Sequence, residues 1–509
     1  MCGIAALIKF NSEKQYHAVA PSLSSLLKTV QNRGQDSTKI ITQLLNPNAE
    51  TYSYNNGVKN TILRNAYDNI LVYCETGGLG LVTKVIDEKI ESDLLGDMGI
   101  GAVRYGTTGP GGNITNVQPV RYKSIVACEN GDINNYQLIN EFLLKKGYPP
   151  FRTTSDVETI TRLFDYHYKT IADEILPEGR SPGIEAMKRC INGYLDAPPL
   201  IGGYAILVMT PHSLIAALDT NGIRQLSYVK KEDGVQFLSE SKGLWHLNNE
   251  INTYNFYDYI KELKPGEIIE VFRDGDIKSE ILQNTRNKHC FFEYVYLSLD
   301  NSVIQTNSVG KVRREIGRLL APKIADNIRK SGNSLENCIV VPVLSTGESY
   351  ALGVAKELGL EYAPYLYKDR YALRTFIMDT QEIRKRGVKI KFTPDVFDLR
   401  DKNIILIDDS ITRGNTLRDI KNVLVKKAGA NKIHGVSACP PVNNSCYYAV
   451  DLKDELIART NTIDQTRDIL ELDSLTYGEE TMWIQVIGED SCRACINGEY
   501  PTQIIRTTR

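Results

Sequence analysis

The sequence predicts a mixed α/β protein whose second half is built on a parallel β-sheet. Two units of strand, polar loop and helix carry this prediction. The apolar run 338–343 leads through a loop into helix-like residues 350–358, and the run 404–407 leads through 408–416 into 417–427. Repeated units of this kind favour parallel strands whose ligand-binding loops gather at their carboxyl ends.

Other segments add strands and helices to this frame. Apolar strand-like runs are found at 4–8, 99–103, 125–128 and 202–208, and a helix is expected through 159–167. An amphipathic helix is expected over 309–330, and Pro322 lies inside it, where a proline can kink or break a helix.

Size and composition limit the class of protein. A chain of 509 residues is expected to form two to four domains, since ~100–200 residues per domain is usual. The balance of 60 basic against 62 acidic residues suggests neither a nucleic acid nor a membrane surface as partner. The sequence starts without a signal-peptide pattern and has no apolar run of ~18 residues, so a cytoplasmic protein is expected. The ten scattered cysteines then favour thiols, a nucleophile and metal ligands over disulfides.

The chain begins Met1-Cys2-Gly3-Ile4 and continues as an apolar strand. Removal of Met1 would leave Cys2 with a free α-amine, whose reference pKa of about 7.7–8.0 lets it act as a base beside its own thiol. The alternative is the ordinary start of a buried strand.

Three further places in the first half carry candidate binding groups. Arg104 ends a strand, and its guanidinium suits an α-carboxylate, although a lone surface arginine is the commoner case. The strand from 125 enters an Asn130-Gly131 turn, which is either an oxyanion hole or a plain hairpin turn. Asp156 lies at a helix start and either caps the helix or holds a substrate ammonium group.

These residues together resemble the class II glutamine amidotransferases, of the N-terminal-nucleophile hydrolase fold, over residues 1 to about 245. The resemblance implies Cys2 as nucleophile and Asn130 and Gly131 as oxyanion hole. It implies that glutamine is bound by Arg104, Thr107 and Asp156. Relatives commonly have His-Asn-Gly-Asn where this chain has Glu-Asn-Gly-Asp at 129–132, and Ser, Pro or Thr in place of Gly106. We expect glutaminase chemistry with altered pKa values or packing beside the oxyanion pair.

The stretch 403–416 is the clearest ligand motif. A buried strand ends in Asp408 and Asp409, and a loop of small polar residues leads into a helix. Backbone N–H groups of such a loop approach a phosphate, while the acids suit ribose hydroxyls or a metal ion. The loop lacks a Gly-Lys-Ser/Thr ending, so it is not a Walker A loop. It resembles the diphosphoribosyl-binding motif of type I phosphoribosyltransferases; the alternative is a solvated acidic turn.

A basic stretch, 368–392, lies between the two polar loops. Its Lys and Arg residues favour a flap that closes over a polyphosphate and excludes water, and the alternative is a solvated basic hairpin.

The order of parts, with Phe-Glu-Tyr-Val-Tyr at 292–296, resembles the amidophosphoribosyltransferase family over nearly the whole chain. The resemblance implies a four-layer αββα N-terminal-nucleophile hydrolase domain, then a type I phosphoribosyltransferase parallel-sheet α/β domain. The expected divisions are 1–250 glutamine amidotransferase, 251–290 junction, 291–470 phosphoribosyltransferase and 471–509 C-terminal segment. The implied ligands of phosphoribosyl diphosphate are Asp408, Asp409, Ser410, Thr412, Arg413, Gly414, Asn415, Thr416, Arg370 and Lys391. Mg²⁺ is implied at Thr346, Asp408 and Asp409.

The implied activity is the first committed step of purine synthesis: glutamine hydrolysis coupled to amination of 5-phosphoribosyl 1-diphosphate. Purine nucleotides are implied as inhibitors, and a homodimer or homotetramer as the assembly. The loop 344–347 lacks an acid that many relatives have, so weaker diphosphate or Mg²⁺ binding is expected. With the altered 129–132 loop, this leaves a second hypothesis, a paralogue that binds sugar phosphate or nucleotides as a regulator or scaffold.

Near the C-terminus Cys492 and Cys495 form a Cys-x₂-Cys pair, which alone fits zinc, iron–sulfur, redox chemistry or chance. Cys290 and Cys446 stand where cluster-bearing relatives have ligands, so the resemblance implies a [4Fe–4S] cluster held by all four, with zinc or free thiols as alternatives. The other cysteines outside the N-terminus, Cys439 among them, are expected to be ordinary buried residues.

Overall fold

The computed structural model describes residues 2–10, 19–45, 63–67, 71–105, 113–175, 181–252, 254–368, 392–448, 450, 452 and 455–505. The chain divides into two compact units. Unit 1 comprises Met1–His289, Tyr447–Asp451 and Tyr500–Arg509, and unit 2 comprises Cys290–Cys446 and Leu452–Glu499. The four functional divisions expected from the sequence stay a prediction.

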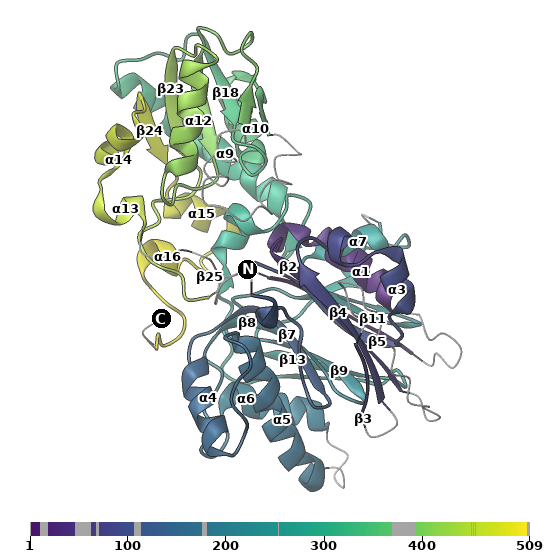
Figure 1. The fold of residues 1–509 in the computed structure, drawn as a ribbon. Coiled ribbons are helices and arrows are strands. Elements are labelled where there is room, and N and C mark those ends of the chain that lie inside the picture. The colour runs from purple at the N-terminus through teal and green to yellow at the C-terminus, as the bar shows by residue number, and fades with distance from the viewer. Residues whose placement is uncertain are drawn as a thin grey trace. The chain divides into compact units, whose positions relative to one another are not determined.

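Unit 1 contains two antiparallel sheets (Figure 1). The eight-stranded sheet has the order β12 (Ile260–Glu262), β10 (Ser227–Lys231), β11 (Gly234–Leu238), β1 (Cys2–Lys9), β5 (Met98–Arg104), β2 (Ser37–Leu45), β4 (Leu71–Leu79), β3 (Leu63–Tyr67). The six-stranded sheet has the order β14 (Ile277–Ile281), β13 (Glu267–Phe272), β9 (Ser213–Leu218), β8 (Gly202–Met209), β7 (Ile125–Ile133), β6 (Val120–Tyr122).

Successive side chains of each strand point to opposite faces of the sheet, and this alternation explains why unit 1 has four layers. Ile4, Ala6 and Ile8 of β1 join Val126 and Leu207 in one core, so the two sheets pack face to face. The opposite faces are covered by helices (Figure 1). Those helices are α1 (Ala20–Thr29), α2 (Val82–Val85), α3 (Glu88–Asp93), α7 (Ser241–Leu247) and α8 (Phe256–Tyr259) beside the larger sheet, and α4 (Tyr136–Lys145), α5 (Asp156–Ile175) and α6 (Pro182–Asn192) beside the smaller. The expected αββα architecture is confirmed.

Unit 2 is built on a five-stranded parallel sheet of order β19 (Glu361–Tyr362), β18 (Cys338–Pro342), β22 (Asn403–Asp408), β23 (Lys432–Ser437), β24 (Ser474–Tyr477). Its other elements include α9 (Val309–Lys330), α10 (Glu348–Leu358), α12 (Asn415–Lys426), α13 (Ile457–Thr460), α14 (Ile463–Leu470), α15 (Glu480–Ile487), α16 (Ala494–Asn497), and the short strands β16 (Val303–Ile304), β17 (Asn307–Ser308), β20 (Leu366–Lys368), β21 (Phe392–Pro394) and β25 (Ser491–Cys492). The short strand β15 (His289–Cys290) contains the last residue of the first segment of unit 1 and the first residue of unit 2. Both predicted strand–loop–helix units are present, and the parallel sheet is confirmed.

Two local expectations differ from the structure. Helix α9 runs through Pro322 without a break. The expected turn at Asn130-Gly131 is wrong, because β7 continues to Ile133 and pairs with β8 along this whole stretch. A Cβ on Gly131 would lie 2.3 Å from the carbonyl oxygen of Gly203, so glycine is needed here for a close backbone approach and not for a turn.

Candidate functional sites

The nucleophile candidate Cys2 is the first residue of β1 and is 8% exposed. Neighbours on both sides hold this strand: Ser239 Oγ accepts from the Ile4 N–H at 2.9 Å, and the Ser239 N–H donates back to the Ile4 carbonyl at 3.1 Å. Arg33, just after α1, donates to the Cys2 carbonyl at 3.4 Å and pairs with Glu240 at 3.1 Å. The thiol is therefore carried by a fixed strand end.

Arg33 was not predicted as part of this site. Arg33 and Glu240 are both fully buried at their side chains, so they form an ion pair inside unit 1 beneath the nucleophile strand. The one sequence signal was an arginine before a glycine at the end of an apolar helix, which is too common to point to a site.

The other candidate glutamine ligands lie around Cys2. Arg104, the last residue of β5, is directly opposite Cys2 across the sheet and is 4% exposed. Asp156 begins α5, and its Oδ2 accepts from the Ile133 N–H of β7 at 3.1 Å, while Ser155 accepts from the Val157 N–H. Ser155 thus serves the helix start and Asp156 faces the strand of the oxyanion pair. Thr107 lies outside the described residues.

Asn130 and Gly131 occupy consecutive positions in β7, opposite Ala205 and Tyr204 of β8. The Asn130 side chain is fully buried, and among the described residues neither its Oδ1 nor its Nδ2 atom has a hydrogen-bond partner. A buried amide without partners is costly, so this amide is set to receive an oxygen from a bound molecule. That property suits an oxyanion hole.

The residue before this pair, Glu129, is buried at 3% exposure. Its pKa is raised well above the ordinary value, first by burial and then by Asp156, Asp132 and Cys2. Burial, with Cys2 and Glu129 nearby, also raises the pKa of the Cys128 thiol. The added acids at 129–132 therefore face the nucleophile region.

In unit 2 the acid pair ends β22, and both carboxyl groups are buried. Asp408 Oδ1 accepts from the Asp409 N–H at 2.9 Å. Asp409 accepts hydrogen bonds from the hydroxyls of Ser410, at 2.6 Å, and Thr346. Burial raises the pKa of Asp409, and the two hydroxyls and the guanidinium of Arg313 oppose that rise.

The loop after the acids leads into α12 by way of Gly414, which has a left-handed conformation at φ 75°. Asn415 and Thr416 are the first residues of the helix. The Thr412 carbonyl accepts from the Ile457 N–H at 2.8 Å, and Arg413 pairs with Glu455 at 3.0 Å with both side chains exposed. The loop therefore presents N–H groups at a helix start. Arg370 and Lys391, with most of the basic stretch, lie outside the described residues.

Thr346 stands on the partner loop after β18. A Cβ on the next residue, Gly347, would lie 2.4 Å from the Ile407 carbonyl oxygen, so this loop packs directly against the end of β22. The Thr346 hydroxyl then reaches Asp409, and the two predicted metal-binding loops are brought together.

Cysteine side chains gather in the C-terminal part of unit 2. Burial raises the pKa of Cys495, and the thiols of Cys439, Cys446, Cys290 and Cys492 raise it further. The three other predicted ligands therefore each act on Cys495, and so does Cys439, which the sequence assigned to the core. Among the described residues no three His, Cys, Asp or Glu side chains are arranged as closely as a single metal ion requires.

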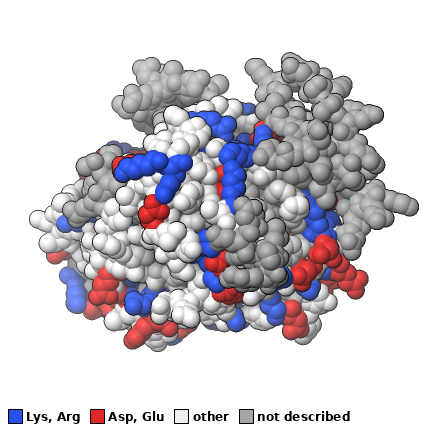
Figure 2. Space-filling view, turned by 90° about the horizontal axis from the view of Figure 1, so that it is seen from below, with Lys and Arg blue, Asp and Glu red and all other residues white. Residues whose placement is uncertain are grey.

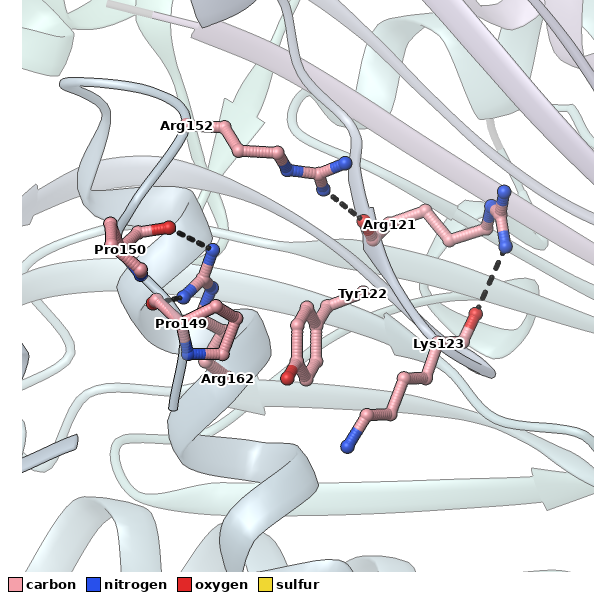
Figure 3. Close-up of a pocket in the computed structure, with 7 residues that line it drawn as sticks. All are labelled: Arg121, Tyr122, Lys123, Pro149, Pro150, Arg152 and Arg162. Atoms are coloured by element: carbon pink, nitrogen blue, oxygen red, sulfur yellow. Dashed lines mark hydrogen bonds between the residues drawn. The ribbon is translucent and has the colours of Figure 1, made fainter. Parts of the chain in front are cut away.

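None of the predicted site residues lines the pocket of unit 1 that Figure 3 shows. It has a volume of about 330 Å³ and is lined by Arg121, Tyr122, Lys123, Pro149, Pro150, Arg152 and Arg162. Glu158 pairs with Arg162 and Arg152, and Asp165 pairs with Lys123. Figure 2, which views one face of the molecule, likewise shows basic and acidic side chains interspersed. Compensated charges of this kind suit loop packing.

Comparison with known proteins decides the family. Residues 313–466 match the phosphoribosyl transferase domain family. An amidophosphoribosyltransferase of Methanocaldococcus jannaschii is 33% identical over 527 aligned residues, which cover 99% of this chain and 98% of the relative. The chain belongs to the amidophosphoribosyltransferase family. A relative of the same name from Bacillus subtilis is 31% identical over 85% of this chain and 86% of its own.

Solved structures agree with this family assignment. The glutamine phosphoribosylpyrophosphate amidotransferase of B. subtilis, complexed with ADP and GMP, matches with a TM-score of 0.76 at 26% identity, covering 100% of this chain and 99% of that one. A structure described as the allosteric regulatory enzyme of purine biosynthesis matches with a TM-score of 0.77 at 27% identity. The resemblance read from the sequence is confirmed, and no finding favours the regulatory paralogue. In the described part of the chain, no helix is long and apolar enough to cross a membrane.

Proposed function

We propose that this member of the family hydrolyses glutamine at Cys2 and uses the ammonia to aminate 5-phosphoribosyl 1-diphosphate. The Cys2 thiol attacks the side-chain amide carbonyl of glutamine, a thioester forms and ammonia leaves. Water then releases glutamate. The ammonia attacks C1 of the ribose, pyrophosphate leaves, and loss of one proton gives 5-phosphoribosylamine.

The observation that carries the first half of this proposal is the partnerless buried amide of Asn130, one strand position from Gly131. When the Cys2 thiolate adds to the amide carbonyl of glutamine, the oxyanion that forms can accept a hydrogen bond from the Asn130 Nδ2 group. Arg104 would bind the glutamine α-carboxylate and Asp156 its α-ammonium group. After removal of Met1, the Cys2 α-amine takes the thiol proton.

In unit 2 the residues fit a magnesium ion that arrives with the diphosphate. Mg²⁺ is usually bound by one or two carboxylates and by substrate phosphates, and Asp408 and Asp409 supply two carboxyl groups beside the Thr346 hydroxyl. When bound, the ion neutralises charge on the leaving pyrophosphate. The loop Ser410–Thr416 would hold the 5′-phosphate at the start of α12.

The cysteines also fit the implied [4Fe–4S] cluster. The thiols of Cys446, Cys290 and Cys492 all raise the pKa of the Cys495 thiol, which supports a site that these four cysteines share. Cys290, Cys446, Cys492 and Cys495 would hold the cluster, which would join the C-terminal tail to the start of unit 2. The cluster is tested by anaerobic analysis of iron and sulfide in the purified protein, with a Cys495→Ser variant as control. If the wild-type protein contains neither iron nor sulfide, the cluster is rejected.

The function is tested with a Cys2→Ala variant. Pyrophosphate release from the diphosphate substrate with Mg²⁺ should fall at least about 1,000-fold when glutamine is the nitrogen source, since covalent catalysis is lost. Release with added ammonia should be unchanged, because unit 2 is intact. If glutamine still drives the reaction, the assignment of Cys2 fails.

Purine nucleotides as inhibitors, and a homodimer or homotetramer as the assembly, belong to the same proposal. The solved relative with ADP and GMP supports the first. Adding GMP to the ammonia-driven assay tests the inhibition, and light scattering of the purified protein measures the oligomeric state.

A further inference from the structure

Three buried carboxyl groups surround the nucleophile region of unit 1. Glu129 and Asp132 lie in β7, Asp156 begins α5, and each is at most 4% exposed. Asp156, Asp132 and Cys2 all raise the pKa of Glu129, on top of its burial. A site that must generate a thiolate at Cys2 would be hindered if all three carboxyl groups carried a negative charge.

The position of Glu129 is fixed by its backbone. Its N–H donates to Gln118 Oε1 at 2.8 Å, and Gln118 Nε2 donates to its carbonyl at 2.9 Å. Glu129 also pairs with Ile206 across β7 and β8. The side chain therefore cannot leave the site by a shift of the strand, and its charge has to be managed in place.

The carboxyl group of Asp156 is the largest influence on the pKa of Glu129 after burial, through its charge and through a hydrogen bond between the two carboxyl groups. Two carboxyl groups form such a bond only when one of them carries a proton. Asp156 Oδ2 accepts the Ile133 N–H at 3.1 Å, a contact that stabilises its anion. The other oxygen of Glu129, Oε2, is buried without a partner among the described residues, which disfavours its anion. The N–H contact of Asp156 and the partnerless Oε2 of Glu129 both favour Glu129 as the group that holds the proton.

We propose that Glu129 is a proton-bearing positioning residue: its neutral carboxyl group donates to Asp156 and orients the carboxylate that receives the substrate's α-ammonium group. This inference rests on the proposed glutamine site. A neutral Glu129 leaves one anion for one ammonium group. An ionised Glu129 would repel Asp156 and add negative charge beside Cys2.

The surrounding groups fix the direction of the pH effect. Glu129 faces Asp156 of α5, Cys2 of β1 and Tyr204 of β8, together with Asp132 and Cys128 on its own strand. Two cations lie at Cys2: Arg104 of β5 is opposite it, and Arg33, paired with Glu240, donates to its carbonyl. As pH rises, Glu129 loses its proton, Asp156 loses its donor, and the affinity for glutamine falls.

The main test compares the wild type with Glu129→Gln in the glutamine-driven reaction. Gln keeps the shape and a donor to Asp156 but has no proton to lose. The ratio of the two kcat/KM values is expected to change about tenfold or more toward alkaline pH, in favour of the variant. A ratio that stays constant with pH overturns the proposal.

A matched control is Glu270→Gln. Glu270 is 1% exposed in β13 of the same sheet, and burial raises its pKa too, but its partners are Ser181, Ser213 and the Ile184 N–H. The ratio of the kcat/KM values of the wild type and Glu270→Gln should not change with pH. If the kcat/KM ratio for Glu270→Gln changes with pH as steeply as the ratio for Glu129→Gln, the effect comes from the loss of any buried acid, and the proposal is overturned.

A second variant and a direct measurement complete the test. Glu129→Ala should raise KM for glutamine about tenfold with a smaller change in kcat, and leave the ammonia-driven reaction unchanged. Infrared spectroscopy at neutral pH should show a protonated-carboxyl band that Glu129→Gln lacks; its absence from the wild type overturns the proposal even if the Ala variant fails to fold. The band is independent of turnover, so it separates this inference from failure of the glutaminase itself, which Cys2→Ala tests.

Discussion

Two acids, Glu129 in unit 1 and Asp409 in unit 2, are both buried, at 3% and 5% exposure, but have opposite partners. Burial is the largest cause of a raised pKa for both. The next influences on Glu129 are other acids, whereas Asp409 receives hydroxyl hydrogen bonds from Ser410 and Thr346 and faces Arg313. Burial thus acts on both acids, but the groups around Glu129 add to the rise of its pKa, whereas the hydroxyls and the guanidinium around Asp409 oppose the rise of its pKa.

Glu240 provides a third arrangement, in which an arginine stabilises the buried acid. Replacing that arginine should change the free energy of unfolding more than any other substitution proposed here. Arg33→Met leaves Glu240 buried without its cation, which typically costs about 3–5 kcal/mol. Urea titration followed by hydrogen exchange should show unit 1 opening earlier while unit 2 is unchanged. The double variant Arg33→Met/Glu240→Met should regain most of this loss. Equal stability of single variant and wild type would show that the pair contributes nothing.

The hydroxyls on Asp409 offer a smaller effect. Thr346→Val keeps the shape and removes one donor, and a hydrogen bond to a charged group is worth about 1.5–3 kcal/mol. The Mg²⁺ concentration that half-saturates the ammonia-driven reaction should rise about tenfold. Ser410→Ala removes the other donor and should act in the same direction. If the half-saturating Mg²⁺ concentration is the same in both variants as in the wild type, these hydroxyls do not contribute to metal binding.

The smallest effect at neutral pH concerns one histidine in each unit. Burial lowers the pKa of His167 and of His434 from 6.5 to about 4. Unfolding exposes them to take up protons, so each contributes stability at neutral pH that is lost as pH falls from 6.5 toward 4, about 2 kcal/mol by pH 5. His167→Gln should flatten the acid sensitivity of unit 1 alone, and His434→Gln that of unit 2 alone. If the acid sensitivity of neither unit changes in these variants, burial of the two histidines is not the cause of that sensitivity.

The sequence predicted the parts that depend on local pattern. Apolar runs before 408 and at 338–343 identified two of the five strands of the parallel sheet, β22 and β18, because fully buried strands read as continuous apolar runs. The nucleophile strand and the acid pair followed from residue order alone.

Features that depend on tertiary contacts were missed. Asn-Gly predicts a turn by propensity, but pairing of β7 with β8 overrides that propensity at Asn130 and Gly131. The Arg33–Glu240 pair joins residues 207 positions apart, and Cys439 reaches Cys495 through the fold. No local pattern encodes such partners.

The central claim, that the two units carry out one coupled reaction, is tested most directly by stoichiometry. Glutamate and pyrophosphate are measured together with glutamine, the diphosphate substrate and Mg²⁺ present and no added ammonia. The account predicts equal amounts of the two products, and loss of both when Cys2 is replaced by Ala. Glutamate released without pyrophosphate, or pyrophosphate released by the Cys2→Ala variant at the wild-type rate, would contradict it.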